Sequence, residues 1–212
     1  MSAKPLTLIV AAAALNNGIG RNNDLPWRIR KDMAFFNKVS TAIASPTTDS
    51  AAPVLMNACI MGRRTWESIP KSHRPLDRRY NIIVTSSKDL IPADLPFCAT
   101  ASSFARALDH IDALSAQPNP SARIDRVFVV GGSSIYQEAL LAPGHHVQIF
   151  LTRVQFPLAD TCDTFFPHMD TSRFALQPHE RLVDAATFDV PAGVQTSESG
   201  LQYEFLLYEA TN

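Results

Sequence analysis

A single carboxylate stands inside an apolar and basic stretch of this chain. Asp32 is the only acidic residue between Leu25 and Phe36, where large apolar side chains are interspersed with arginine and lysine. Such an acid suits one cationic ring that donates hydrogen bonds. Read as a helix, the segment puts Ile29, Met33 and Phe36 on one face, with Asp32 beside them. The alternative is that Asp32 only caps a helix or favours its positive end.

Three predicted strand ends carry groups suited to phosphates. Gly131–Ser134 follow an apolar strand and open a helical pattern, whose first N–H groups are free to bind an anion. Gly62–Thr65 repeat this arrangement and add two arginines, whose forked guanidinium groups bind phosphate. Thr85–Lys88 add hydroxyls and a further cation. Each turn alone also fits an ordinary connection, but together they predict a dinucleotide laid across the carboxyl edge of a parallel sheet.

The segment Asn17–Trp27, between the first predicted strand and the Asp32 helix, is rich in glycine and asparagine. Loops of this composition can close over a ligand and exclude water. The alternative is a plain connection with several turns.

Composition limits the classes of protein that remain. The chain has 212 residues, 46% hydrophobic and 18% charged, which suffices for one sizeable domain or two small lobes sharing a core. A net charge of -1 gives no reason to expect nucleic acid or a membrane as partner. Cys59, Cys98 and Cys162 are widely spaced and odd in number, which predicts free thiols in a reducing compartment and no metal site. We interpret Cys59, in an apolar run, as a core residue.

Apolar runs of strand length alternate with helical patterns along most of the chain. The run Leu6–Leu15 imitates a signal peptide, but it leads directly into a turn and is too short to span a bilayer, so we expect a buried strand, with a targeting role as the alternative. The alternation predicts an α/β fold with a mostly parallel central sheet of about eight strands and flanking helices. Residues 173–177 and 202–209 look like strands with no helix between them, which predicts an antiparallel C-terminal hairpin. Residues 41–53 and 117–122 are expected to be surface loops.

The chain also contains a long series of short motifs in a fixed order. The series comprises Val10-Ala11-Ala12, Gly18-Ile19-Gly20, Asp24-Leu25-Pro26-Trp27, Asp32 with Phe36, Met61-Gly62-Arg63-Arg64-Thr65-Trp66, Ser68-Ile69-Pro70, Arg74-Pro75-Leu76, Arg79, Val130-Gly131-Gly132-Ser133-Ser134-Ile135-Tyr136, Thr152-Arg153 and Asp163-Thr164-Phe165-Phe166-Pro167. Through these motifs the chain resembles the dihydrofolate reductase family over essentially its whole length. The lengths of residues 41–53 and of the stretch after Asp184 are similar to those of fungal members.

The resemblance implies a reaction and a setting for it. It implies NADPH-dependent reduction of 7,8-dihydrofolate to 5,6,7,8-tetrahydrofolate, which supplies one-carbon metabolism for thymidylate and purine synthesis. It also implies a single domain over residues 1–212 with an adenosine-binding lobe at roughly 54–125, in a cytoplasmic monomer that binds dihydrofolate and antifolate inhibitors. The peptide bond between Gly131 and Gly132 is expected to be cis.

The resemblance also assigns substrate contacts. Asp32 would bind the 2-amino and N3 edge of the pterin, with help from Thr152 and from a water molecule near Trp27; these three are the expected catalytic residues. Arg79 would pair with the α-carboxylate of the glutamate tail. The remaining expected substrate contacts come from the backbone carbonyls of two strands, from one small residue, from apolar walls and from a tyrosine: Val10, Val130, Ala11, Met33, Phe36, Ile69, Leu76 and Tyr136.

Cofactor contacts are implied in three groups. Ala12, Ile19 and Gly20 would border the nicotinamide. The diphosphate would lie against two strand-to-helix turns, formed by Gly62, Arg64, Thr65, Gly131, Gly132, Ser133, Ser134, Ile135 and Tyr136. The 2′-phosphate, which distinguishes NADPH from NADH, would be held by Arg63, Ser86, Ser87 and Lys88.

The chain departs from the vertebrate pattern in two respects. Vertebrate-like members place one arginine where Ser87 stands and another near Ser102, so the 2′-phosphate here must depend more on Arg63 and Lys88. Asp32 replaces a glutamate, a bacterial-like choice that keeps the carboxylate and shortens its reach. Two alternatives stay open: a pyrimidine reductase of the same fold, and a non-catalytic pteridine- or nucleotide-binding protein.

Overall fold

The computed structural model describes residues 4–43, 53–87, 89–92, 94–117, 120 and 122–211. Lys88, most of the expected loop 41–53 and part of the expected loop 117–122 lie outside the described residues. The strands are β1 (Leu6–Ala13), β2 (Gly18–Gly20), β3 (Val54–Gly62), β4 (Arg79–Val84), β5 (Cys98–Ala101), β6 (Ala122–Val129), β7 (Val147–Gln155), β8 (Thr164–Phe165), β9 (Phe174–Leu176), β10 (Gln195–Thr196) and β11 (Gln202–Ala210). The helices are α1 (Arg30–Thr41), α2 (Arg63–Ser68), α3 (Phe104–Ala116), α4 (Ser133–Leu140) and α5 (His179–Ala186), with short 3-10 turns η1 (Lys71–His73) and η2 (Ala159–Thr161).

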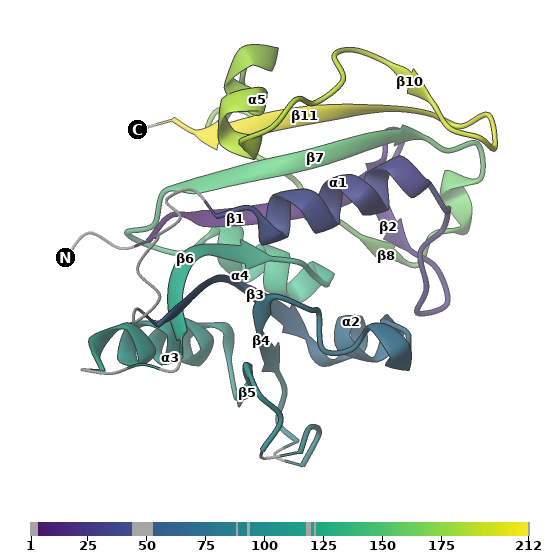
Figure 1. Ribbon diagram of the computed structural model, residues 1–212. Helices are drawn as coiled ribbons and strands as arrows, with labels where there is room; N and C mark the ends of the chain where they lie inside the picture. Colours follow the sequence, from purple (N-terminus) through teal and green to yellow (C-terminus); the bar gives the residue numbers. More distant parts are fainter. Residues whose placement is uncertain are drawn as a thin grey trace.

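One large sheet organises the described residues. Its strands run in the order β10-β11-β7-β1-β6-β3-β4-β5, with β9 also paired to β11. The strands from β7 to β5 pair in parallel, whereas β11 pairs antiparallel with β7, β9 and β10. Figure 1 shows β11 near one end of this sheet and β5 at the other. The prediction of a mostly parallel α/β fold with an antiparallel C-terminal part is confirmed.

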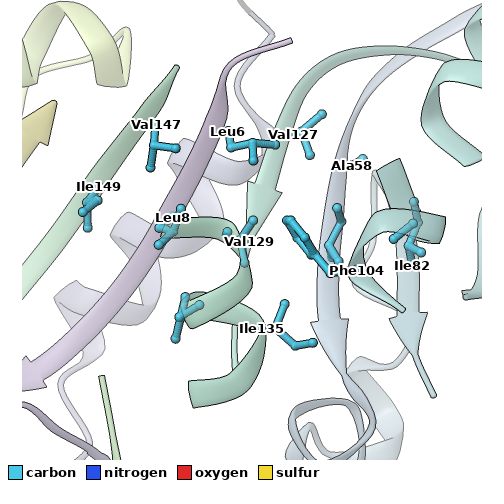
Figure 2. Close-up of a cluster of buried hydrophobic side chains, with 14 of the residues drawn as sticks. Leu6, Leu8, Ala58, Ile82, Phe104, Val127, Val129, Ile135, Val147 and Ile149 are labelled. Carbon is cyan, nitrogen blue, oxygen red and sulfur yellow. The ribbon is translucent and has the colours of Figure 1, made fainter. Parts of the chain in front are cut away.

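Helices cover both faces of the sheet because its central strands are apolar on both sides. Leu6, Leu8, Val10 and Ala12 of β1 pack with residues of α3 and α4 in one core layer, part of which is drawn in Figure 2. Ile9 and Ala13, the alternate residues of β1, pack with residues of α1, α2 and α5 in the other layer. This alternation is what a strand buried on both faces requires. The expected buried strand at 6–15 is therefore found as β1, in the middle of the sheet.

One local expectation is wrong. A helix, α5, lies between the two C-terminal strands where none was expected, and it buries Leu182 and Ala186 against the sheet. Only two of its eight residues are buried, and a helix of eight residues is shorter than the stretch over which a helical period is usually recognised. The Asp32 helix also begins one residue after Ile29 and buries Phe35 and Val39, whereas Met33 is 48% exposed. Ile29 is buried, Phe36 is half-buried and Met33 is exposed, so the face predicted from their spacing is covered only in part within the described residues.

A small second sheet fixes the loop after β1. Strand β2 pairs antiparallel with β8, and the Asn16 side chain donates to the Ala159 carbonyl oxygen at 2.9 Å and accepts from the Gly18 N–H at 3.0 Å. The loop 17–27 is thus tied at its start to the segment around η2. In the described part of the chain, no helix is long and apolar enough to cross a membrane.

Candidate active site

Asp32 lies in the first turn of α1, and its carboxylate is directed at the sheet. The hydroxyl of Thr152 on β7 is its hydrogen-bond partner. Burial raises the pKa of Asp32 from 3.8 to about 6, and the bond from Thr152 opposes this shift. The residue at the N-cap is Ile29, and no side chain caps the helix. The interpretation of Asp32 as a helix cap is therefore wrong, although its charge does lie near the positive end of the helix.

The strand register places a small side chain beside this pair. Ala11 on β1 is opposite Thr152 on β7, which in turn is opposite Phe205 on β11. Side chains in one such row point to the same face of a sheet, here the face that α1 covers. The small methyl group of Ala11, which is only partly buried, leaves room for a flat ring close to the strand.

Trp27 contributes a buried donor to the same layer. Its side chain is 5% exposed and packs edge-on against Phe156, with 5.2 Å between ring centroids. The indole Nε1 is buried and has no hydrogen-bond partner among the described residues. Because buried N–H groups are nearly always paired in native proteins, this donor fits a site that receives a polar ligand atom or a water molecule.

Several apolar side chains that pack against the core layer under α1 are only partly covered. The second core layer ends in a set of half-buried residues that includes Ala11, Phe36, Ile69, Leu76 and Val130. Leu76 is held by its own N–H, which donates to the Asn81 side-chain oxygen at 3.0 Å. Together with the exposed Met33, these five residues leave apolar surface on the side of the sheet that α1 covers, which a ligand can complete.

Arg79, at the start of β4, is a buried cation with neutral partners. It is 6% exposed, and it donates from Nε to the Asp77 carbonyl oxygen and from Nη1 to the Ser40 hydroxyl, both at 2.8 Å. Its guanidinium carbon lies 5.7 Å from the Phe36 ring centroid. Desolvation lowers the pKa of Arg79, and within the described residues it forms no salt bridge. A buried guanidinium of this kind suits an anionic ligand group.

Sequence reasoning missed the residues that hold Arg79. Ser40 is fully buried on α1, and its hydroxyl also donates to the Phe36 carbonyl oxygen at 2.7 Å. Asn57 on β3 donates to the carbonyl oxygens of Ser40 and Ala42, at 2.9 and 2.8 Å, and so fixes the end of α1. A polar Asn57 inside an apolar strand was a signal that could have been used. Ser40 carries no comparable signal.

The carboxyl ends of β3 and β6 meet as expected of a dinucleotide site. The Gly62 N–H donates to the Gly131 carbonyl oxygen at 2.8 Å, and the peptide bond between Gly131 and Gly132 is cis, as the resemblance led us to expect. Gly131 has φ +118°, and a Cβ there would lie 3.4 Å from Thr65 and from Tyr136. Helix α4 begins after Gly132 with no side-chain cap, so its first N–H groups are available to an anion. This edge fits a diphosphate.

Charged and hydroxyl side chains extend this edge toward β4. Arg63 and Arg64 open α2 and are exposed, as are Ser86 and Ser87 after β4. Arg63 is paired with Glu67 one turn later on α2. Thr65 is partly buried beside the two glycines. Lys88 lies outside the described residues, so its expected contribution stays a prediction.

Several predicted residues lie on the other face of the sheet. Val10, Ala12, Ile135 and Tyr136 belong to the core layer that α3 and α4 cover, and Ile19 packs against it. The Tyr136 hydroxyl donates to the Ile9 carbonyl oxygen at 2.7 Å, and burial raises its pKa, with Asp32 adding to the effect. The side chains of Val10 and Ala12 are therefore buried in this layer and offer a ligand no polar group. A ligand contact by Tyr136 stays a prediction.

The described part of the chain carries free thiols and no metal-binding cluster. All three cysteines are free, and Cys59 is buried in the core, as predicted, with its pKa raised to about 12 by burial. Among the described residues, no group of three or more histidine, cysteine, aspartate or glutamate side chains could hold a metal ion.

Glycine-bearing strand ends beside a desolvated carboxylate are typical of α/β enzymes that bind a dinucleotide next to a second, smaller ligand. Comparison with known proteins narrows this class. A family model described as dihydrofolate reductase matches residues 6–197, and the chain belongs to this family of NADPH-dependent oxidoreductases.

Individual relatives agree with this assignment. The chain is 37% identical over 210 residues to a dihydrofolate reductase of Sus scrofa, which covers 99% of this chain and 100% of the relative. It is also 37% identical over 207 residues to that of Mus musculus, covering 97% of each. The solved dihydrofolate reductase of Schistosoma mansoni superposes with a TM-score of 0.75 at 32% identity, covering 99% of this chain and 100% of the other. The likeness to fungal members stays a prediction.

Proposed function

We propose that this protein reduces 7,8-dihydrofolate to 5,6,7,8-tetrahydrofolate with NADPH and so supplies one-carbon metabolism for thymidylate and purine synthesis. The observation that carries the proposal is the Asp32 carboxylate, desolvated on α1 and bonded by Thr152 from β7, on the side of the sheet where several apolar side chains are only half-buried. Membership of the dihydrofolate reductase family supports the same reaction.

In this proposal Asp32 binds the pterin through its amino edge. The carboxylate accepts hydrogen bonds from the 2-amino group and from N3, and Thr152 holds it in place. The carbonyl oxygens of Val10 and Val130 accept from the pterin amino group, and Ala11 leaves room for the ring. A negative charge at this place stabilises the cation that develops when N5 is protonated.

The proton itself reaches N5 through water rather than directly from Asp32, because the carboxylate is occupied by the amino edge. The buried and unpartnered Nε1 of Trp27 is a donor suited to hold such a water molecule. Trp27 and Thr152 therefore act with Asp32 in the proposed catalytic group.

The tail of the substrate extends toward Arg79 in this proposal. Met33, Phe36, Ile69 and Leu76 form the apolar walls along the aminobenzoyl group, and Arg79 binds the α-carboxylate of the glutamate. The support is the buried guanidinium, which has only neutral hydrogen-bond partners among the described residues.

NADPH, when bound, supplies the hydride. Ala12, Ile19 and Gly20 border the nicotinamide. The diphosphate is bound by the two strand-to-helix turns, comprising Gly62, Arg64, Thr65, Gly131, Gly132, Ser133, Ser134 and Ile135. Arg63, Ser86, Ser87 and Lys88 hold the 2′-phosphate. Residues of roughly 54–125 form an adenosine-binding lobe within a single domain over 1–212.

We place the protein in the cytoplasm as a monomer that binds dihydrofolate and antifolate inhibitors and does not bind nucleic acid. The net charge of -1 supports the last point, because nucleic-acid binding needs a concentrated basic surface.

The test is the loss of NADPH absorbance when dihydrofolate is added to the purified protein. We expect turnover with dihydrofolate and none with a pyrimidine substrate, and we expect Asp32→Asn to slow hydride transfer at pH 7 by at least about tenfold and to change its pH profile. Turnover of a pyrimidine alone would favour the pyrimidine reductase, and tight binding of both ligands without turnover would favour a non-catalytic binding protein.

A further inference from the structure

Arg63, on which 2′-phosphate binding would depend, forms an ion pair with Glu67. The Nη1 group of Arg63 donates to both carboxylate oxygens of Glu67, at 2.9 Å to Oε1 and 3.2 Å to Oε2. The two residues are one turn apart at the start and end of α2, and their side chains are 51% and 37% exposed. The pair is therefore within reach of a ligand from solvent.

Exposed hydroxyl side chains follow β4 at this part of the sheet edge. Ser86 and Ser87 are exposed and uncharged, and the Ser87 N–H already donates to the Thr85 hydroxyl at 3.1 Å. Arg64 is exposed on the same short helix. The Glu67 carboxylate thus lies beside the Arg63 guanidinium, which would also bind the 2′-phosphate.

We propose that Glu67 is a specificity-determining residue, which weakens the binding of dinucleotides that carry a 2′-phosphate and so limits the preference for NADPH over NADH. A phosphate monoester that binds Arg63 must share the guanidinium with Glu67 or displace it, and it brings further negative charge near the Glu67 carboxylate. NADH has no group at this position and leaves the pair undisturbed. This inference rests on the proposed placement of the 2′-phosphate at Arg63.

Equilibrium binding tests it, with the apoprotein titrated separately with NADPH and NADH. We expect Glu67→Gln to tighten NADPH binding about two- to fivefold, the size typical of an exposed ion pair, and to leave NADH binding unchanged. The gain should shrink when the salt concentration is raised, because exposed charges are screened. Glu209→Gln is the matched control, because Glu209 is paired with Arg181 at 2.7 Å between α5 and β11. This control should leave the ratio of the two affinities unchanged.

A second variant separates the inference from the placement on which it rests. Arg63→Gln should weaken NADPH binding and not NADH binding. If Arg63→Gln leaves the ratio unchanged, the proposed place of the 2′-phosphate is wrong, and the inference fails with it. If Arg63→Gln lowers the ratio while Glu67→Gln leaves NADPH binding unchanged or weaker, Glu67 only orients Arg63, and the inference alone is overturned.

Discussion

The two desolvated charges of the candidate site, Asp32 and Arg79, have different neutral hydrogen-bond partners. Asp32 is desolvated and bonded to a neutral hydroxyl, whereas Arg79 is buried among carbonyl and hydroxyl oxygens. Neither has an ionic partner of opposite sign among the described salt bridges. Buried charges without such partners are costly, and functional sites are where proteins commonly keep them. Each is therefore best completed by a ligand of opposite charge.

Ser40→Ala tests how Arg79 is held. The change removes the hydroxyl that accepts from Arg79 Nη1 at 2.8 Å, and we expect dihydrofolate to bind about fivefold more weakly, the worth of one hydrogen bond. A dihydropterin without the glutamate tail should bind as before, as measured by fluorescence titration. Thr41→Ala is the control, because the Thr41 hydroxyl makes a similar bond to the Asn37 carbonyl oxygen at the surface of the same helix. Equal weakening of both ligands would show that Ser40 acts only on the fold.

At the scale of elements, the loop after β1 depends on one close approach. A Cβ placed on Gly18 of β2 would lie 2.5 Å from the Cys162 Sγ atom and 2.6 Å from its Cβ. Cys162 is 7% exposed and cannot move away without disturbing the segment that leads into β8. The pairing of β2 with β8 therefore requires glycine at position 18.

Gly18→Ala should lower the free energy of unfolding by about 1–3 kcal/mol, the usual cost of overpacking. Urea unfolding monitored by circular dichroism measures it. Gly20→Ala is the comparison, because its Cβ would lie 3.2 Å from the Thr164 Cβ and should cost less. Equal stability of Gly18→Ala and the unmodified protein would mean that the two segments separate at little cost.

At the scale of the whole molecule, the desolvated Asp32 couples stability to pH. Its pKa is about 6 in the folded state against an ordinary value of 3.8. The folded protein thus binds more protons than the unfolded chain between these values, and its stability falls as the pH rises from about 4 to 6. Above pH 6 the ionised carboxylate carries the full penalty.

Asp32→Asn removes this titration. We expect the variant to be more stable than the unmodified protein by about 3 kcal/mol at pH 8, with the difference disappearing below about pH 4. Urea unfolding at a series of pH values measures both curves. A stability difference that does not change with pH would show that the carboxyl group is solvated in the folded protein.

The sequence alone determined the class of fold and most residue types at the site. Apolar runs alternating with helical patterns specified a parallel sheet, because strands buried on both faces must be apolar throughout. The motifs around Asp32, Arg63 and Gly131 carried the resemblance to the dihydrofolate reductase family, and their residue types suit a cationic ring, a phosphate and a close backbone approach.

Only the tertiary structure decided which groups meet. The bond between Thr152 and Asp32, the bond between Ser40 and Arg79, and the burial of Phe35 instead of Met33 all depend on strand order and on how α1 lies over the sheet. Local periodicity fixes the type of an element but not its neighbours. Helix α5 was missed for the same reason. Its few buried residues make their apolar contacts only once β11 is in place.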